Sequence, residues 1–269
     1  MVGWDYLEYV FLKLGEDNSI MLDIDFIISL SSSELVELLK PLFSDDNSVN
    51  NCTLDRLEER SEFIINIAKI IKEKFLGKAE SLIKLSQGYL INNGKGLYEL
   101  LDYFVPYSTD PLKKKSTAFV KFLEEANLIR IQDPENFIPI IDYHAQRVML
   151  RMGCVEIMNL DLKEKLQKMQ EIDSDIVIRS NCVDAIRIIA EESGFSIPQI
   201  DDFFWSLGRS CCKEMMLCRD GICNKKPCTF NSIIDLSEHN NCIFENTCEG
   251  SKNDEYAKFW QPIVKTNFY

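Results

Sequence analysis

Cysteines are concentrated late in this 269-residue sequence, where seven of the ten lie between positions 211 and 248. These seven are Cys211, Cys212, Cys218, Cys223, Cys228, Cys242 and Cys248. Four thiolates can hold an iron–sulfur cluster or a tetrahedral zinc ion. In a reducing compartment such a dense group favours metal binding over disulfides, with free or redox-active thiols as the alternative. The remaining three, Cys52, Cys154 and Cys182, are scattered through apolar sequence, and we expect them to be small buried side chains.

A second group of residues that could perform chemistry surrounds Asp142. The apolar run Pro139-Ile-Ile leads to Asp142, and a helical pattern follows that carries His144, Arg147 and Arg151. This position predicts a helix N-cap, whose carboxylate accepts backbone N–H bonds at the positive end of the helix dipole and so stays ionised. Arg147 and Arg151 share a helix face and could meet an anion or acidic side chains. Asp142 could also be a cap and nothing more, and we expect His144 to pack at a lobe junction rather than transfer protons.

Helices must position both groups, because apolar residues recur at helical spacing almost throughout and strand-like alternation is scarce. Ser31 and Glu34 have the form of a capping box, and Pro134 and Pro198 stand where helices would begin. After Arg209 the sequence is too polar to form a core of its own, so a cofactor would organise it. The pattern predicts an all-α fold with helices near 3–14, 32–43, 54–76, 79–91, 95–104, 111–127, 142–152, 161–170, 174–193 and 198–207.

The composition is that of an ordinary globular chain, with 46% hydrophobic and 27% charged residues. No apolar run approaches the roughly 18 residues of a membrane helix, and the N-terminus lacks the basic-then-apolar order of a secretory signal. We therefore expect a cytoplasmic protein that does not contact membranes. The net charge of -13 works against a long polyanionic partner, although a local basic patch such as Lys113–Lys115 could still bind one.

The segment from Trp205 to Cys212 resembles the helix end that leads into the cluster loop of endonuclease III-type glycosylases, members of the helix-hairpin-helix (HhH-GPD) superfamily. In that family the run ends in a glycine, an arginine and the first cysteine ligand, and by distance from Gly208 this ligand falls on Cys212. The family spacing is C-x6-C-x2-C-x5-C. Here Cys211-x6-Cys218 reproduces the first interval and Cys242-x5-Cys248 the last. An insertion that carries Cys223 and Cys228 disrupts the middle interval.

The resemblance implies a 4Fe–4S cluster, with zinc as the alternative metal. The ligands it favours are Cys212, Cys218, Cys242 and Cys248, with Cys211, Cys223, Cys228 and His239 as substitutes. It also implies a two-lobed helical DNA-glycosylase-like fold with a C-terminal metal-binding cysteine loop. The parts would be residues 1–30 as an N-terminal helix packing on the C-terminal lobe, 31–141 and 142–209 as the helical lobes that form the cleft, and 210–269 as the cluster loop and tail.

The segment around Asp142 is similar to the V-D-x-H-x-x-R helix start of the same glycosylases. This similarity implies that Asp142 stabilises the oxocarbenium character of the sugar, or activates the nucleophile, during N-glycosidic bond cleavage. Most DNA glycosylases of the superfamily also carry a glycine-rich hairpin before this aspartate, which binds a DNA phosphate. This chain has no such hairpin.

A candidate nucleophile comes from the segment Lys115–Phe122, which resembles the archaeal 8-oxoguanine glycosylase branch. The similarity implies Lys121 as a Schiff-base lysine, which requires a lowered pKa from burial or nearby cations. The alternative is a solvated lysine, because the apolar face of this predicted helix points away from Lys121. That face comprises Phe119, Phe122, Leu123 and Ala126.

The layout is also similar to the queuosine salvage glycosylase family, through Asp142-Tyr143, Gln146-Arg147, Arg151, Gly153, Ile178-Arg179 and the helix from Asp201 to Trp205. Those enzymes act on a nucleotide, which an acidic chain accommodates more easily than a polymer. The candidate substrate-binding residues are Tyr143, His144, Arg147 and Trp205. Tyr143, Trp205 and Phe119 could stack on a base, although such aromatics more often belong to a core.

Three functions follow as hypotheses. The first is a monomeric N-glycosidase, a hydrolase that could also have lyase activity, which removes a modified base from DNA in base excision repair or from a nucleotide. The second is a queuosine-type glycosidase acting on a small substrate. The third is a non-catalytic iron–sulfur or zinc binding module, suggested by the missing hairpin and the negative charge.

Overall fold

The computed structural model describes residues 4–46, 48–223, 225–235 and 240–268. Within these ranges the chain forms fifteen α-helices, five 3-10 helices and two isolated β-bridges, and no sheet. The predicted all-α fold class is therefore confirmed. In the described part of the chain no helix combines the length and the apolar character needed to cross a membrane.

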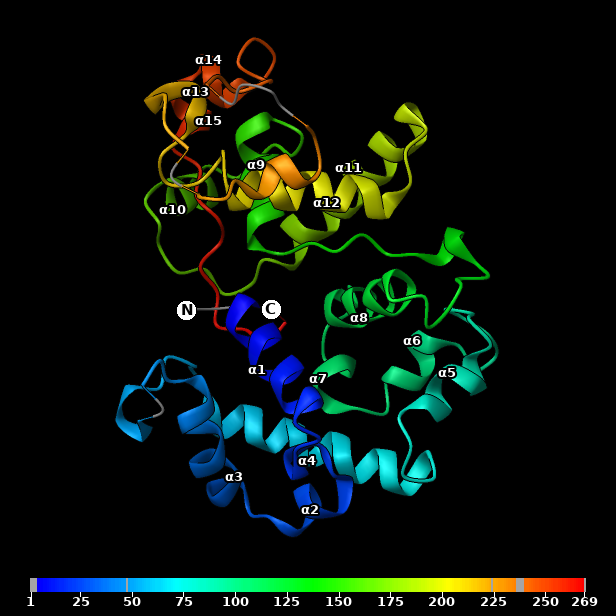
Figure 1. Ribbon diagram of the computed structural model, residues 1–269. Coiled ribbons are helices and arrows are strands. Elements are labelled where there is room, and N and C mark those ends of the chain that lie inside the picture. The colour runs from blue at the N-terminus through cyan, green and yellow to red at the C-terminus, as the bar shows by residue number, and fades with distance from the viewer. Residues whose placement is uncertain (1–3, 47, 224, 236–239, 269) are drawn as a thin grey trace. The chain divides into compact units, whose positions relative to one another are not determined.

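The α-helices follow one another along the chain with connections of very different lengths (Figure 1). They are α1 (Trp4–Glu16), α2 (Ile24–Ser29), α3 (Ser32–Leu39), α4 (Leu57–Lys74), α5 (Glu80–Ser86), α6 (Leu97–Leu101), α7 (Val105–Ser108), α8 (Lys114–Glu125), α9 (Tyr143–Met152), α10 (Leu160–Gln167), α11 (Ile176–Ser193), α12 (Ile197–Arg209), α13 (Leu217–Asp220), α14 (Glu249–Lys252) and α15 (Asp254–Ala257). Each of the ten predicted helices overlaps one of these. The unpredicted ones, α2, α7 and α13 to α15, are too short to show a helical period.

The local signals for helix ends give mixed outcomes. The Ser31 capping box at the start of α3 is confirmed, because the Ser31 N–H donates to Glu34 at 2.8 Å and the Glu34 N–H donates to Ser31 Oγ at 3.3 Å. Pro198 stands in the first turn of α12 as predicted. Pro134 starts only the three-residue 3-10 helix η4 (Pro134–Asn136).

The chain divides into two compact units, which are described separately. The first comprises the described residues of Met1–Thr109 together with Leu128–Asp133, and the second comprises Asp110–Asn127 and the described residues from Pro134 onward. The segment Asp110–Asn127, which we predicted to belong to the 31–141 lobe, is thus part of the second unit. The reason is visible in its contacts, because its first residue forms an ion pair with α11.

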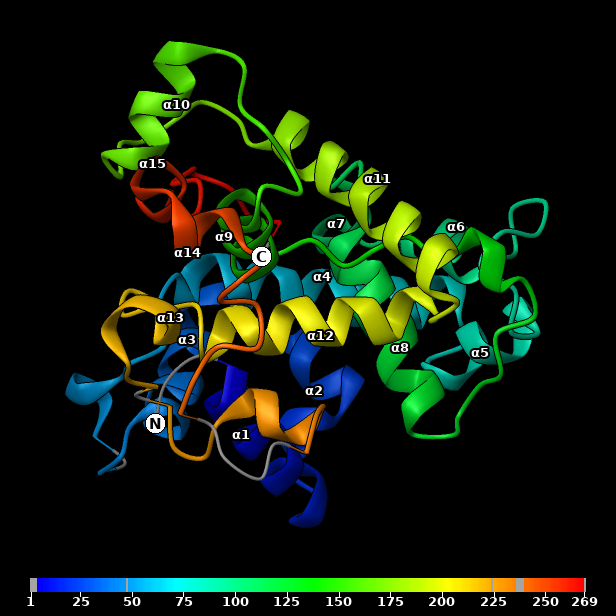
Figure 2. The same ribbon diagram turned by 90° about the horizontal axis from the view of Figure 1, so that it is seen from above.

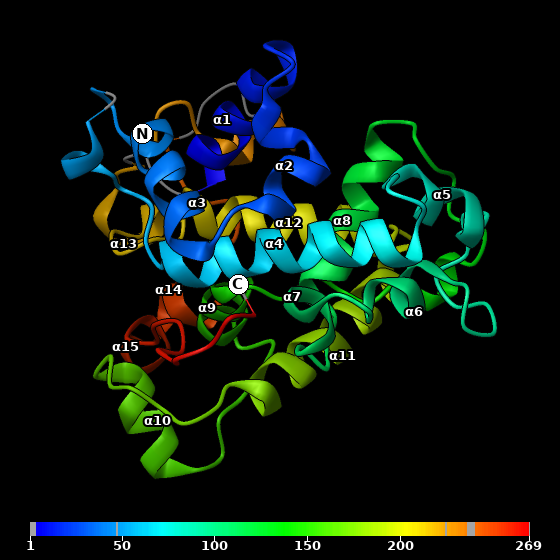
Figure 3. The ribbon, with the colours of Figure 1, turned by 90° about the horizontal axis from the view of Figure 1, so that it is seen from below.

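In the first unit, α2 and α3 pack on the long helix α4 (Figure 3). Its core gathers apolar side chains from all of these helices, among them Leu35, Leu39 and Ile65. The helix α1, predicted to pack on the C-terminal lobe, contributes its buried side chains to this same core, where the ring of Tyr6 lies 5.5 Å from that of Phe43. The first unit therefore has a core of its own.

In the second unit, α9 is the central helix and packs against α11, α12, α14 and α15 (Figures 1 and 2). Val148, Met149 and Leu150 on α9 are fully buried. Gly208 on α12 faces the start of α9 so closely that an added Cβ would lie 2.7 Å from the carbonyl oxygen of His144. Only glycine permits this approach.

A buried ion pair joins α8 and α11 in the same unit. The Arg179 guanidinium donates to both carboxylate oxygens of Asp110, at 2.9 and 2.7 Å, and the two side chains are 0% and 2% exposed. The same two oxygens also accept the N–H groups of Leu112 and of Lys114, the first residue of α8. Although burial acts to raise it, these contacts lower the pKa of Asp110.

We expect Arg179→Met to destabilise the protein by about 3–5 kcal/mol, because it leaves the Asp110 carboxylate buried without a cation. The free energy of unfolding from chemical denaturation measures this loss. The exposed pair of Lys165 and Asp161 offers the control, since Lys165→Met should leave stability nearly unchanged. Replacing both buried partners, as Asp110→Leu with Arg179→Met, should recover much of the loss. Equal stability of Arg179→Met and the control would contradict the argument.

Candidate functional site

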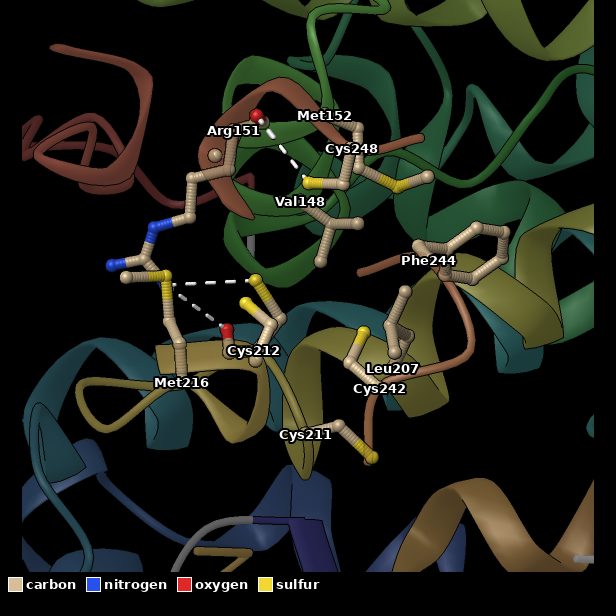
Figure 4. Close-up of a pocket in the computed structure, with 12 residues that line it drawn as sticks. Val148, Arg151, Met152, Leu207, Cys211, Cys212, Met216, Cys242, Phe244 and Cys248 are labelled. Carbon is tan, nitrogen blue, oxygen red and sulfur yellow. Dashed lines mark hydrogen bonds between the residues drawn. The ribbon is translucent and has the colours of Figure 1, made fainter. Parts of the chain in front are cut away.

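Five cysteines line one pocket in the second unit: Cys211, Cys212, Cys218, Cys242 and Cys248. We call it the four-cysteine pocket after the last four, which are the set that the resemblance favoured as ligands. Val148, Leu207 and Phe244 give the pocket apolar walls. The four thiols come from three separate segments of the loop, which the fold brings around one space (Figure 4).

Short helical turns position these cysteines. The N–H of Cys212 donates to Leu207 O at 2.9 Å and so turns the chain back at the end of α12. Cys218 lies within α13, and Cys248 is the N-cap of α14. The thiol of Cys248 contacts the carbonyl oxygen of Arg151, the penultimate residue of α9, at 3.7 Å. The end of α9 therefore forms one side of the cysteine pocket.

Arg147 and Arg151 reach from α9 to this loop, although we predicted that they meet an anion or acidic groups. Arg147 donates to Cys212 O at 3.0 Å and to Gly208 O at 2.6 Å. Arg151 donates to Lys213 O at 2.6 Å, and its Nη1 lies 3.6 Å from Cys212 Sγ. Within the described residues neither forms an ion pair with a carboxylate. Most of their partners are backbone carbonyls of the loop, and Arg147 also contacts the side chains of Gln261 and His144. These arginines therefore hold the loop against α9.

Cys211 also belongs, with the two remaining cysteines of the loop, to a second group, which we call the cysteine trio: Cys211, Cys223 and Cys228. Their sulfur atoms all lie within 4.8 Å of one another. The Sγ–Sγ distances are 3.9 Å between Cys211 and Cys228 and 3.8 Å between Cys223 and Cys228. The trio could bind a metal ion. Sequence reasoning treated these residues only as substitutes in a single site.

Protonation of the thiols reflects their close packing. A hydrogen bond between Cys218 and Cys242 raises the pKa of Cys218 and lowers that of Cys242. Burial raises the pKa of Cys211 and of Cys248. Such buried thiols become thiolates readily only when a cation is present, so metal binding would release protons.

The three cysteines outside the loop, and His239, complete the set of candidates. Cys182 is buried, as predicted, and Cys52 is half-buried. Cys154 is exposed, contrary to prediction. It follows Gly153, which ends α9 in the left-handed conformation and turns the chain away from the core. The substitute ligand His239 lies outside the described residues.

Asp142 is the N-cap of α9, as predicted. Its Oδ1 accepts the N–H of Ala145 at 2.9 Å, and the residue is 7% exposed. It lines neither the cysteine pocket nor the pocket near Ser31 and Ser32 in the first unit. Its negative charge acts to raise the pKa values of Lys114, Asp201 and His144.

Lys114 is a functional candidate that sequence reasoning missed. It is the first residue of α8, is half-buried, and feels the charges of Asp142, Arg179 and Asp110. Burial lowers its pKa, opposed by the two carboxylates. The run Lys113–Lys115 signalled only a basic patch, because nothing in the sequence separates the buried lysine from its neighbours.

Asp201 on α12 completes this charged group. Its Oδ2 accepts the N–H of Ile140 at 2.9 Å, whereas its buried Oδ1 has no hydrogen-bond partner. Burial raises the pKa of Asp201 well above its ordinary value, and the charges of Asp202 and Asp142 raise it further. A raised pKa favours the protonated form of Asp201, and this group lies within electrostatic reach of Asp142.

Lys121 is placed in a different environment from either predicted one. Its side chain is only 12% exposed and forms ion pairs with Asp202, at 2.9 Å, and with Glu125. Burial alone would lower the pKa of Lys121, but these hydrogen bonds raise it. A raised pKa opposes the deprotonated amine that a nucleophile needs.

The predicted apolar face of α8 is confirmed for Leu123, which is buried, and is wrong for two of its other members. Phe122, placed on that face, is exposed, and so is Ala126. The residues of α8 that are buried are Ser116, Thr117, Val120 and Leu123. Apolar spacing failed here because two of the buried positions are hydroxyl residues.

The predicted substrate-binding residues lie around α9 and α12. The rings of Tyr143 and His144 are 4.2 Å apart, and His144 Nδ1 lies 3.1 Å from Arg147 Nη2. Burial, with Asp142 beside it, raises the pKa of Tyr143. Trp205 is half-buried, with the Arg209 guanidinium 4.9 Å from its ring centre. Arg147 is committed to loop carbonyls, so it is a structural residue in this arrangement.

No protein-family model and no curated protein sequence matches this chain. The site geometry therefore carries the functional argument.

The pKa of His144 generates a testable pH effect. Burial lowers it from 6.5 to about 4, against the opposing charge of Asp142. The unfolded chain takes up this proton near pH 6.5 and the folded protein only near pH 4, so stability falls as the pH is lowered through that window. We expect His144→Asn, which keeps an acceptor in place of Nδ1, to show a flatter pH dependence of the unfolding free energy between these limits. Parallel curves for both proteins would refute the neutral buried histidine.

Proposed function

We propose that this protein is an N-glycosidase that removes a modified base and binds a 4Fe–4S cluster near its catalytic carboxylate. One observation carries the proposal: α9 bears Asp142 at its start and, at its end, contacts the pocket of four cysteines. This is the arrangement implied by the sequence similarity to endonuclease III-type glycosylases. The fold class and the convergence of the thiols support the same reading.

The charges around Asp142 suit cleavage of an N-glycosidic bond. As the C1′–N bond breaks, the base leaves with the electron pair and the sugar acquires positive character, which a fixed carboxylate stabilises. The raised pKa of Asp201 favours its protonated form, which would leave Asp142 as the carboxylate that carries the charge here. The small exposed part of Asp142 is where a sugar would have to approach.

Lys114 is the better candidate for an amine nucleophile in this reaction. Its burial lowers the pKa, whereas the ion pairs of Lys121 raise the pKa of that side chain. An attacking Lys114 amine would form a bond to C1′ and lose a proton, and the departing base would gain one. Without such an attack, a water molecule would fill this role and Lys114 would only balance the charge of Asp142.

The four cysteines fit a cluster by their chemistry. Thiolates of Cys212, Cys218, Cys242 and Cys248 would hold it, and the buried guanidinium of Arg151 beside Cys212 would offset part of their negative charge. A bound cluster would cross-link segments of the loop with one another, beside the end of α9. Zinc in the same four-cysteine pocket is the alternative metal.

A nucleotide fits the charge of the chain better than a duplex does. The net charge of -13 gives little long-range attraction for a polyanion. The queuosine-type reading, in which the substrate is small, is therefore the form of the proposal that the electrostatics favour.

Base release tests the catalytic assignment. We expect Asp142→Asn to lower the rate of nucleobase release by about 100- to 1000-fold, because the amide keeps the cap but loses the charge. Lys114→Met should lower it as well and should abolish any borohydride-trapped covalent adduct, whereas Lys121→Met should do neither. Candidate substrates are modified nucleotides and duplexes that contain modified bases, with release followed by chromatography.

A non-catalytic cluster protein is the second candidate, and the burial of Asp142 favours it. That function predicts no base release from any substrate and no effect of Asp142→Asn on metal content. Activity that survives Asp142→Asn would rule out the carboxylate mechanism.

The metal assignment predicts a role for Arg151. Arg151→Met removes the buried cation beside Cys212, and we expect the iron and acid-labile sulfide retained after anaerobic purification to fall several-fold. Arg187→Met is the matched control, since Arg187 is exposed on α11. Unchanged iron content in Arg151→Met would show that the arginine does not support the pocket.

A further inference from the structure

The seven cysteines of the loop form two groups that meet at Cys211. Cys211 and Cys212 both line the four-cysteine pocket, and Cys211 also belongs to the trio, in which its sulfur lies within 4.8 Å of those of Cys223 and Cys228. Figure 4 shows the Cys211 sulfur turned away from the sulfurs of Cys212 and Cys242. Cys223 and Cys228 are absent from the lining of the pocket. One loop therefore offers thiols at two separate places.

The spacing of the trio is that of a mononuclear site. With Zn–S bonds of about 2.3 Å, the sulfurs of a tetrahedral zinc ion lie about 3.8 Å apart. The sulfurs of Cys223 and Cys228 are 3.8 Å apart, and those of Cys211 and Cys228 are 3.9 Å apart. In a 4Fe–4S cluster each thiolate binds a different iron, so the sulfurs lie farther apart. Among the described residues, the four cysteines of the pocket do not form a group as tight as the trio.

Two similar segments deliver cysteines to the two places. Cys228-Thr-Phe230 serves the trio, and Cys242-Ile-Phe244 serves the pocket. The rings of Phe230 and Phe244 both meet Phe203 of α12 edge to face, at 5.3 and 5.6 Å. Each cysteine is therefore fixed by an aromatic anchor two residues later, and the trio is as well supported as the pocket.

The trio is also held from its other side. Cys228 is the N-cap of η5 (Thr229–Ser232), and the N–H of Phe230 donates to Ser210 Oγ at 3.2 Å. Ser210 precedes Cys211 and in turn donates to Ser206 O at 2.6 Å. The segments that carry Cys211 and Cys228 are thus connected through the Ser210 hydroxyl, independently of any metal.

We propose that Cys211, Cys223 and Cys228 form a second metal site that binds Zn²⁺, distinct from the four-cysteine pocket. Three thiolates are soft ligands suited to zinc, and they leave a fourth tetrahedral position for water or an added ligand. Three thiolates with Zn²⁺ carry one net negative charge, and Lys225 and Lys226 lie in the segment between Cys223 and Cys228. The inference does not depend on base removal.

Metal content of the full-length protein tests the division. After anaerobic purification the wild type should hold zinc in addition to iron and sulfide. Cys223→Ser and Cys228→Ser should lose the zinc and keep the iron, whereas Cys242→Ser and Cys248→Ser should lose the iron. Cys52→Ser, at a half-buried cysteine of the first unit, is the control for a thiol outside both groups. Loss of iron in Cys223→Ser and Cys228→Ser would overturn the proposal by assigning the trio to the cluster.

A second measurement uses the wild type and avoids any folding defect of the variants. Thiol alkylation followed by mass spectrometry should show that Zn²⁺ protects Cys223 and Cys228 but leaves Cys52 reactive. Co²⁺ added to zinc-free protein should give the charge-transfer absorption of a tetrahedral thiolate complex. Equal alkylation with and without Zn²⁺, or a Cys223–Cys228 disulfide in the isolated protein, would overturn the site.

Discussion

Two buried arginines on one helix constrain the second unit more than any other interaction. Burying a guanidinium is costly unless its N–H groups are satisfied and its charge is compensated. Arg147 and Arg151 meet this requirement with loop carbonyls and with Trp260, whose ring lies 4.6 and 5.5 Å from the two guanidinium carbons. Burial lowers the pKa of Arg147 only to about 10, so it stays charged at neutral pH. The loop after α12 must therefore fold back over α9.

The same constraint connects the two ends of α9. Because the helix is rigid, the cysteine loop and the carboxylate at the helix start are held at a fixed position relative to each other. Around that carboxylate, Asp110 and Arg179 fix the start of α8, which brings Lys114 within reach of Asp142. A metal or cluster bound to the loop would then support a charged site about ten residues away along the helix, without taking part in its chemistry.

Much of this arrangement could be predicted from the sequence because it is local. Helical spacing located ten helices, and the Asp142 cap follows from an aspartate before an amphipathic run. The remainder depends on contacts between distant segments. Lys121 is neutralised by Asp202, which lies 81 positions later, and no pattern within α8 signals that partner. Likewise, adjacent Cys211 and Cys212 look interchangeable in sequence, and only the turn after α12 sends their sulfurs to different places.

The close approach at Gly208 changes the meaning of a sequence signature. In the family motif this glycine is the landmark from which the first ligand is counted, yet here its contact is with the backbone of His144. Because glycine lacks a Cβ atom, the axes of α9 and α12 can lie this close together. The requirement for glycine is purely steric. Any protein whose helices cross at this distance would keep the glycine whether or not it carried iron. The glycine therefore indicates the close helix crossing, and only the cysteines indicate a metal site.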